Sequence, residues 1–405
     1  MKEHIKSNLE KEVFIIGSGP GDIMHLTPKA REAIINSQEV YAFDRFFDLF
    51  TSIRQDIKKC SCDEIVNKVE NSFAKTICIL VSGDIGFFSI AKTLINKIGC
   101  KYNVYSLCGI SSLQYFCGKL GISYEDINIV SLHGRQINIL GDIAYNRYTF
   151  VLTGGKNNAS TILQQLHENG VTGITVTAGE NLSMPTEKIV SGNIKELLQY
   201  NFDSLTVLLF ENMNYKDKEK TLFDKDFSRN KTPMTKQEVR WTCTSMLDIS
   251  PTDIVFDIGA GSGSVAIAMS RKAYKGTVYA IEQNPNAYTV LNENIFNFCA
   301  LNVISVLGEA TNEIKKLPIP SKVFIGGSGG NLREIVEFLY KQNPNVTVVL
   351  NAITLETLSL SMSVFEDLAI KPSVLCLNTA RNKTVGNYNM MTANNPVYII
   401  CSTSS

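Results

Sequence analysis

Short apolar runs alternate with longer amphipathic stretches along most of this chain, and this alternation constrains the fold more than any other feature of the sequence. The runs have the length and β-branched content of buried strands, whereas stretches such as 28–36 and 157–168 carry apolar residues at helical spacing. Strands that alternate with helices favour an α/β fold with a largely parallel sheet. In the first half of the chain, the predicted strands are 13–16, 76–81, 148–152, 172–177 and 205–210.

The alternation is interrupted by a polar, densely charged segment that runs from Asn212 to Thr221 and is followed by Pro233, a pattern typical of a linker. We therefore predict two α/β domains, 1–212 and 233–405, joined by a linker at 213–232. With 405 residues in all, each domain is long enough to bury a core without disulfides. In the second domain, the predicted strands are 254–257, 277–281, 303–307, 322–325, 346–350, 374–377 and 397–400.

Composition excludes several classes of protein. Lys plus Arg number 39, as do Asp plus Glu, so no net positive charge attracts a phosphate backbone and we expect no nucleic-acid partner. Apolar stretches such as 205–210 are far shorter than the ~20 residues that span a bilayer, so we expect no membrane association and a cytoplasmic protein. The ten cysteines are scattered and several lie in apolar runs, which is typical of buried free thiols in a reducing compartment. Neither they nor the four histidines show zinc-site spacing, so we expect no metal.

The run 254–265 has the pattern of a strand, a glycine-rich turn and the start of a helix. Its glycines allow a tight turn and close approach to a ligand, with the helix N-terminus behind them. The next predicted strand leads into Glu282, nineteen positions after Gly263. In a parallel doubly wound sheet such an acid stands beside the loop, where it can accept both ribose hydroxyls of an adenosine. The series predicts a site for an adenosine-containing ligand; the alternative is a structural turn with a solvated glutamate.

The glycine spacing is G-x-G-x-G, and Asp257 stands on the strand just before it. Both features resemble the Rossmann-like S-adenosylmethionine-dependent methyltransferases more than NAD-dependent dehydrogenases. The first domain has three further glycine-containing turns after predicted strands, at 17–22, 80–88 and 108–112. By themselves, these three turns are equally consistent with ordinary chain reversals.

Five motifs lie in series along the first domain: GSGPGD (17–22), SGDIGFF (82–88), GISS (109–112), SLHGR (131–135) and LTGGKN (152–157). Together they resemble the tetrapyrrole methylase family. This family implies a two-lobed α/β fold, and SLHGR and LTGGKN indicate its cobalamin-pathway branch, which methylates carbon 5 of the ring. Cys108, Gly154 and Ile85 depart from the family pattern.

The second domain contains the motifs PMTKQEVR (233–240), DIGAGSGS (257–264), FIGGSGG (324–330), NAITLET (351–357) and NPV (395–397). In these motifs it is similar to the enzymes that methylate carbon 15 and decarboxylate the ring C acetate, and the tandem order resembles the precorrin C(5,15)-methyltransferases (decarboxylating). The resemblance implies S-adenosylmethionine as cofactor, a precorrin or cobalt-precorrin substrate, and a homo-oligomer. Two other interpretations are an RNA or small-molecule methyltransferase with an N-terminal recognition domain, and a nucleotide-sensing module without turnover.

The resemblance implies two sets of cofactor-binding residues. In the second domain they are Thr235, Gly259, Ala260, Gly261, Ser262, Gly263, Glu282, Glu309 and Ala310. In the first domain they are Gly17, Gly19, Pro20, Gly21, Asp22, Gly83, Asp84, Ser111, Ser112, Asn181 and Leu182.

Methyl transfer from a sulfonium is an in-line displacement, which depends on alignment rather than on a covalent nucleophile. A polyanionic macrocycle favours planar cationic forks, and Arg240 and Arg381 are the first candidates for its carboxylates. Glu356 is the candidate proton donor for decarboxylation, and His133 could orient the substrate. The alternatives are solvated charges, a helix-start carboxylate and a structural histidine. Further cationic candidates are Arg45, Arg135, Lys156 and Arg333.

Overall fold

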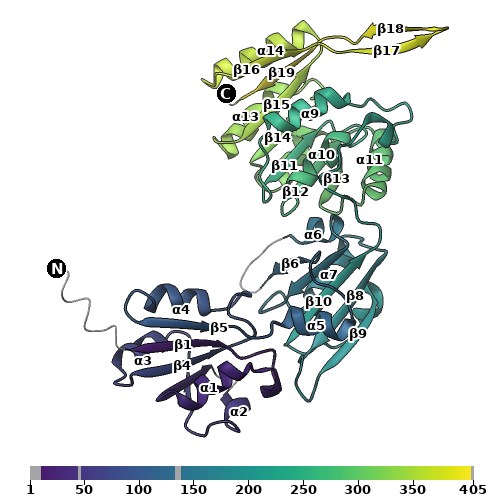
Figure 1. Cartoon of the computed structure of the whole chain (residues 1–405). Helices are drawn as coiled ribbons and strands as arrows, with labels where there is room; N and C mark the ends of the chain where they lie inside the picture. The colour runs from purple at the N-terminus through teal and green to yellow at the C-terminus, as the bar shows by residue number, and fades with distance from the viewer. Residues whose placement is uncertain (1–10, 44–46, 133–137, 403–405) are drawn as a thin grey trace. The chain divides into compact units, whose positions relative to one another are not determined.

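The computed structural model describes residues 11–43, 47–132 and 138–402, which form two compact units. The first unit comprises the described residues within 1–135, together with 150–167 and 175–210. The second comprises those within 136–149, 168–174 and 211–405. Both are of the α/β class, as the sequence predicts (Figure 1). Over the described ranges, every helix is too short or too polar to cross a membrane.

The first unit contains a five-stranded parallel sheet in the order β3-β2-β4-β1-β5. Alternate residues of β4 face opposite sides, as a period of two requires: Ile77 and Ile79 pack with α3 and α4, whereas Cys78 and Leu80 pack with α1 and α2. Both faces are therefore covered by helices. The elements are β1 (Glu12–Gly17), η1 (Ile23–His25), α1 (Pro28–Asn36), β2 (Glu39–Phe43), α2 (Phe47–Phe50), β3 (Lys58–Cys60), α3 (Ile65–Asn71), β4 (Thr76–Val81), α4 (Ala91–Ile98) and β5 (Asn103–Leu107).

A second five-stranded sheet follows, in the order β6-β7-β10-β8-β9, in which β8 and β9 are antiparallel. The helix before it begins at a capping box, in which Ser111 and Gln114 each accept a hydrogen bond from the other's backbone N–H. The elements are α5 (Ser112–Leu120), β6 (Asn128–Ser131), α6 (Leu140–Ala144), β7 (Tyr148–Leu152), α7 (Ala159–Glu168), β8 (Ile174–Glu180), β9 (Lys188–Asn193), α8 (Ile194–Leu197) and β10 (Thr206–Asn212).

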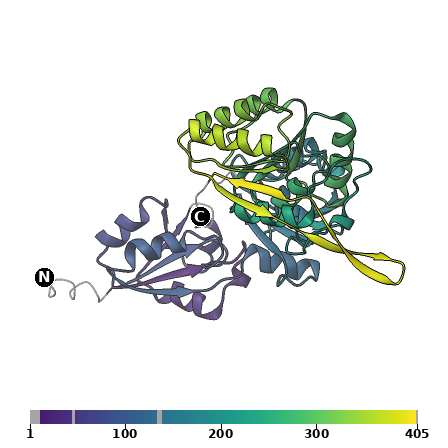
Figure 2. The same cartoon turned by 90° about the horizontal axis from the view of Figure 1, so that it is seen from above.

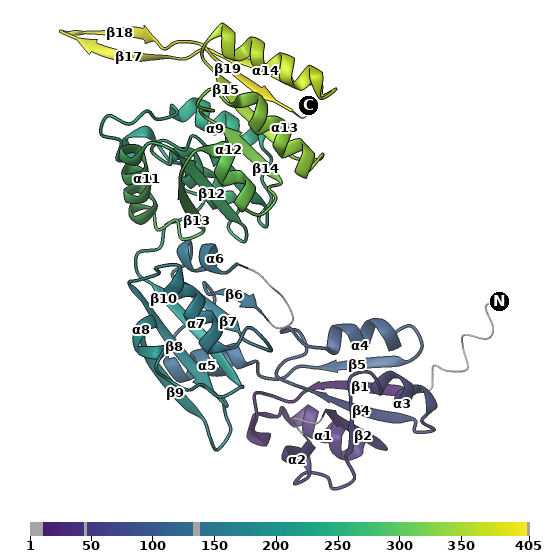
Figure 3. The same cartoon turned by 180° about the vertical axis from the view of Figure 1, so that it is seen from behind.

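The second unit is built on a seven-stranded sheet in the order β13-β12-β11-β14-β15-β19-β16. Its first five strands are parallel, and β19 runs antiparallel to β15 and β16. Residues of α9, α10 and α11 pack on one face, and residues of α13 and α14 pack on the other (Figures 1 and 3). The strands are β11 (Ile254–Ile258), β12 (Thr277–Glu282), β13 (Val303–Leu307), β14 (Lys322–Ile325), β15 (Thr347–Ala352), β16 (Ser373–Leu377) and β19 (Val397–Cys401). The helices are η3 (Asp224–Asp226), α9 (Gln237–Met246), α10 (Ser264–Lys272), α11 (Pro285–Asn297), α12 (Ala310–Glu313), η4 (Ile314–Lys316), α13 (Leu332–Gln342) and α14 (Leu355–Asp367).

Two segments of the second unit bear on its site. Within 213–232, the range predicted as a linker, Leu222 and Phe227 are buried in the core cluster that includes Val239 of α9. The hairpin of β17 (Ala380–Val385) and β18 (Tyr388–Ala393), called the arm below, has every residue exposed and extends away from the sheet (Figure 2).

Candidate active site

A cavity of about 570 Å³ lies in the second unit at the carboxyl ends of its parallel strands. The chain runs from β11 to β12 on one side and later to β14 on the other, so the strand order reverses at β11. Such a reversal leaves a crevice where ligands bind in open α/β sheets. Residues that follow β11, β12, β13 and β14 line the cavity, together with residues 233–236 before α9.

The loop after β11 requires glycine at two positions. Gly259 has φ of 73° and Gly261 has φ of 56°, values in the left-handed region that residues with a Cβ disfavour. A Cβ on Gly259 would lie 2.5 Å from the carbonyl oxygen of Gly327, so the loops after β11 and β14 touch through their backbones. One on Gly261 would lie 2.9 Å from the carbonyl oxygen of Pro233. Three backbone segments therefore meet at this part of the cavity wall.

Glu282, at the end of β12, directs its carboxylate at this loop. It is 8% exposed, with Oε2 accepting a hydrogen bond from Gly261 N at 2.8 Å and Oε1 accepting one from Asn284 N at 2.8 Å. A carboxylate has about four lone-pair sites, so both oxygens can still accept hydrogen bonds from a ligand. Such a carboxylate can accept hydrogen bonds from the ribose hydroxyls of a nucleoside, and the glycines beside it let the ligand approach the backbone closely.

Asp257 lies on β11 beneath the loop and is fully buried. Burial and, to a smaller extent, the nearby negative charge of Glu282 raise the pKa of its carboxyl to about 7, although a hydrogen bond from the backbone of Ala266 lowers it. This carboxyl therefore holds its proton to a much higher pH than an exposed aspartate does.

Most of the predicted cofactor residues of the second unit share this cavity. Ser262 and Gly263 are not among the described residues that line it: Ser262 is buried, and Gly263 is the N-cap of α10. Those that line it are Thr235, Gly259, Ala260, Gly261, Glu282, Glu309 and Ala310. Sequence reasoning missed other lining residues, of which Gln283, Asn284 and Ile353 follow strand ends. The others lie within a helix or strand: Ala287, Asn351 and Val397.

The first unit has its own cavity, of about 430 Å³, beyond the carboxyl ends of β1 and β4. Among its predicted residues, those that line it are Pro20, Gly83, Ser112, Asn181 and Leu182. Sequence reasoning did not assign Phe87, Phe88 and Met184 to this wall. Phe88 has φ of 47°, an unusual value for a bulky residue, and strain of this kind is concentrated at functional sites.

The other predicted residues of the first unit brace its loops. Gly19 and Gly83 exchange backbone hydrogen bonds of 3.1 and 2.9 Å, and a Cβ on Gly17 would lie 2.7 Å from Gly83 O. The Asp84 carboxylate accepts hydrogen bonds from Gly86 N at 2.8 Å and Gly109 N at 3.0 Å. Asp22 caps η1, Ser111 caps α5, and a Cβ on Gly21 would lie 2.8 Å from Met184 Cγ.

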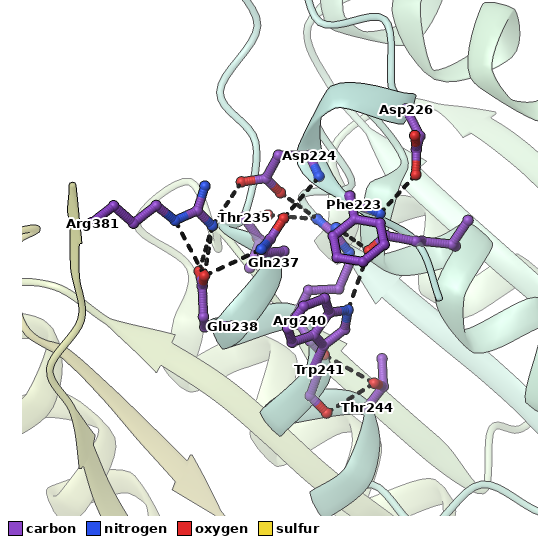
Figure 4. Close-up of polar contacts among 11 residues, drawn as sticks. Phe223, Asp224, Asp226, Thr235, Gln237, Glu238, Arg240, Trp241, Thr244 and Arg381 are labelled. Atoms are coloured by element: carbon purple, nitrogen blue, oxygen red, sulfur yellow. Dashed lines mark hydrogen bonds and ion pairs between the residues drawn. The ribbon is translucent and has the colours of Figure 1, made fainter. Parts of the chain in front are cut away.

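The residues predicted to contact the substrate are absent from the described lining of the two cavities. Glu356 is exposed in the first turn of α14, three residues after Ile353 of the cavity wall. Arg240 is buried and Arg381 lies on the arm, and both bind carboxylates of the protein (Figure 4). Arg333 pairs with Asp367 at 2.6 Å, and Lys156 is exposed. His133, Arg45 and Arg135 lie outside the described residues.

Comparison with known proteins finds two families in succession. The tetrapyrrole (corrin/porphyrin) methylases match residues 12–198, and the precorrin methyltransferase domain matches residues 225–403. The chain is 34% identical over 210 residues to a probable cobalt-precorrin-7 C(5)-methyltransferase of Methanocaldococcus jannaschii, covering 49% of this chain and 97% of that one. It is 32% identical over 170 residues to a probable cobalt-precorrin-6B C(15)-methyltransferase (decarboxylating) of Pyrobaculum calidifontis, covering 42% and 87%. A crystal structure of precorrin-6y C5,15-methyltransferase from Geobacter metallireducens GS-15 is 39% identical, covers 46% of this chain and 96% of that chain, and gives a TM-score of 0.43.

Proposed function

The chain belongs to the cobalt-precorrin methyltransferases, with a tetrapyrrole methylase part followed by a precorrin methyltransferase part, and we propose that it carries out two methyl transfers and one decarboxylation on a single macrocycle. The first unit methylates carbon 5 of a precorrin or cobalt-precorrin. The second methylates carbon 15 and releases the ring C acetate carboxyl as carbon dioxide. S-adenosyl-L-methionine is the methyl donor in both.

The observation that carries this proposal is one glycine-lined cavity in each unit, at the carboxyl ends of parallel strands. An enzyme that carries out one methyl transfer needs one such site. Two transfers at different carbons need the planar substrate to bind in two orientations, and two sites can provide them. One of the relatives that match this chain is named for methylation of carbon 5, and another is named for methylation of carbon 15. Neither an RNA methyltransferase nor a non-catalytic sensor has comparable support.

The protein's contribution to methyl transfer is alignment. S-adenosylmethionine supplies a methyl group on a positively charged sulfur, and no protein nucleophile is needed. Glu282 would hold the ribose, while Met234, Ile353 and Val397 give the cavity wall apolar surface against which a flat ring can lie. Holding reactants in line contributes up to about 7–11 kcal/mol to such a reaction.

Decarboxylation needs a proton donor, because protonation of the conjugated ring accepts the electron pair left by carbon dioxide. Glu356 is our proposed donor. It stands on the solvent-exposed first turn of α14, where a macrocycle projecting beyond Ile353 would meet it.

Calorimetric titration with S-adenosylhomocysteine, the product of methyl donation, tests the two-site proposal. We expect two sites per chain, and Glu282→Gln should weaken one of them about 10- to 100-fold, because it removes a charge-assisted acceptor. Glu334→Gln, which neutralises an exposed carboxylate of α13 in the same unit, is the matched control and should leave both sites intact. A single site in the unaltered protein, or equal behaviour of the two variants, would contradict the proposal.

A further inference from the structure

Arg240 of α9 is the largest fully buried side chain among the described residues, and its guanidinium is bound by the protein itself. Nη1 donates to Thr235 O at 2.9 Å and to Asp224 Oδ1 at 3.2 Å, and Nη2 donates to Leu222 O at 3.1 Å (Figure 4). The guanidinium carbon also lies 4.9 Å from the ring centre of Phe227. A buried cation held by a carboxylate, two carbonyls and a ring face is anchored in one position and is not available to a substrate carboxylate.

This anchor reaches the cavity through Thr235. Residues 233–236 form one part of the cavity wall, and the carbonyl of Pro233 contacts the glycine loop at Gly261. Lys236, the N-cap of α9, makes no side-chain capping hydrogen bond, and its carbonyl accepts the helical hydrogen bond from Arg240 N at 2.9 Å. The hydrogen bond from Arg240 to Thr235 O therefore ties the wall segment to η3.

A second arginine connects the same cluster to the arm. Arg381 of β17 donates from Nη2 to both carboxylate oxygens of Glu238, at 2.6 and 2.8 Å, and lies 3.7 Å from Asp224 Oδ2. Glu238 sits two residues before Arg240 on α9. Its burial raises the pKa, but its backbone hydrogen bond and Arg381 more than offset this, so the pKa lies below its usual value and Glu238 is charged. Arg381 on the arm thus pairs with Glu238 and Asp224, and Asp224 in turn pairs with Arg240, which holds the cavity wall at Thr235.

We propose that Asp224, Glu238, Arg240 and Arg381 form a positioning cluster, which makes adenosyl-ligand binding in the second unit depend on the attachment of the arm. Arg240 and Asp224 hold the wall segment 233–236, and Arg381 holds Asp224 and Glu238 from outside the cavity. This inference rests on the proposed function for the identity of the ligand. It assigns Arg240 and Arg381 a role distinct from binding the carboxylates of the macrocycle.

The test compares Arg381→Gln with Lys383→Gln in the full chain. Lys383 lies two residues along the same strand, hence on the same face, and is also exposed, so both variants lose one positive charge from one face of the arm. In the ligand-free protein, hydrogen–deuterium exchange of residues 233–240 should be faster in Arg381→Gln than in Lys383→Gln. Emission of Trp241, the only tryptophan, provides a second readout, because its Nε1 donates to the Leu222 carbonyl that also binds Arg240.

With ligand, Arg381→Gln should raise the Kd for S-adenosylhomocysteine at the second-unit site about three- to fivefold, the range for a partly exposed ion pair. KM for S-adenosylmethionine should rise by the same factor with kcat unchanged, and Arg381→Lys should restore part of the affinity. Glu238→Gln should match Arg381→Gln, and the double variant should be no weaker than either single variant.

Equal exchange, emission and Kd in Arg381→Gln and Lys383→Gln would overturn the inference, and additive losses in the double variant would do the same. If Arg381→Gln does not fold, Glu238→Gln against Glu334→Gln gives the same comparison from the helix side. Failure of the unaltered protein to bind S-adenosylhomocysteine would refute the cofactor assignment alone, because the exchange and emission differences require no ligand.

Discussion

Replacing Gly259 by alanine should destabilise the second unit far more than the same change at Gly327, the residue that Gly259 contacts. Alanine at Gly259 must adopt φ of 73°, which costs about 1–2 kcal/mol. Its Cβ would lie 2.5 Å from Gly327 O and 2.8 Å from Gly327 N, whereas ordinary contact begins at 3.4 Å. Both neighbours are backbone atoms that cannot rotate away, so the loops must separate, at a further cost of about 1–3 kcal/mol.

The expected total is about 2–5 kcal/mol, or a fall in Tm of roughly 5–15 °C for a unit of this size. Trp241 is the only tryptophan and lies in the second unit, so thermal unfolding followed by its emission reports on that unit. S-adenosylhomocysteine binding at that site should also weaken, because Gly259 and Gly327 both line the cavity. Gly327→Ala, whose Cβ meets no heavy atom within 4 Å, should change Tm by no more than about 2 °C. Equal losses in the two variants would refute the close-contact argument.

Two further predictions concern a buried carboxyl and a strained aromatic. Because the pKa of Asp257 is raised to about 7, the folded chain binds this proton more tightly than the unfolded chain, and this group's contribution to stability falls as pH rises from about 4 to 7, by up to about 1.4 kcal/mol per pH unit. The free energy of urea unfolding of the unaltered protein, minus that of Asp257→Asn, should therefore fall as pH rises across this range, and a difference that is constant with pH would exclude the effect. Phe88→Asn should keep stability within about 0.5 kcal/mol, since asparagine tolerates positive φ, while it slows carbon-5 methylation by removing apolar cavity wall. Phe73→Asn, at a fully exposed phenylalanine of the same unit, should leave that rate unchanged, and equal rates in both variants would argue against a role for Phe88.

Features set by local pattern could be predicted from the sequence. The helix expected at 28–36 is α1, and the series from the strand at 254 to Glu282 places that carboxylate beside Gly261, as expected for parallel strands that end at one edge. Period and spacing suffice there, because each relation spans one βαβ unit.

Features set by contacts between distant residues could not be predicted. The range 213–232 is charged, yet Leu222 and Phe227 enter the core, because their burial depends on α9 and the sheet beyond it. The types of Arg240 and Arg381 suggested carboxylate partners, but the sequence does not show that those partners are Asp224 and Glu238; the latter lies 143 residues from Arg381. A signal for the arm was present, since Gly386 and Asn387 form a two-residue turn between β17 and β18.

The mass of the product tests the central claim most directly. The purified chain would be incubated with S-adenosylmethionine and a precorrin-6-level macrocycle, with and without cobalt. We predict the gain of two methyl groups and the loss of one carbon dioxide, with the preferred substrate showing whether cobalt is already present. One methyl group with loss of carbon dioxide would contradict activity in the first unit and direct attention to Cys108, Gly154 and Ile85. An unchanged mass, despite S-adenosylhomocysteine binding, would contradict the assignment of a corrin substrate.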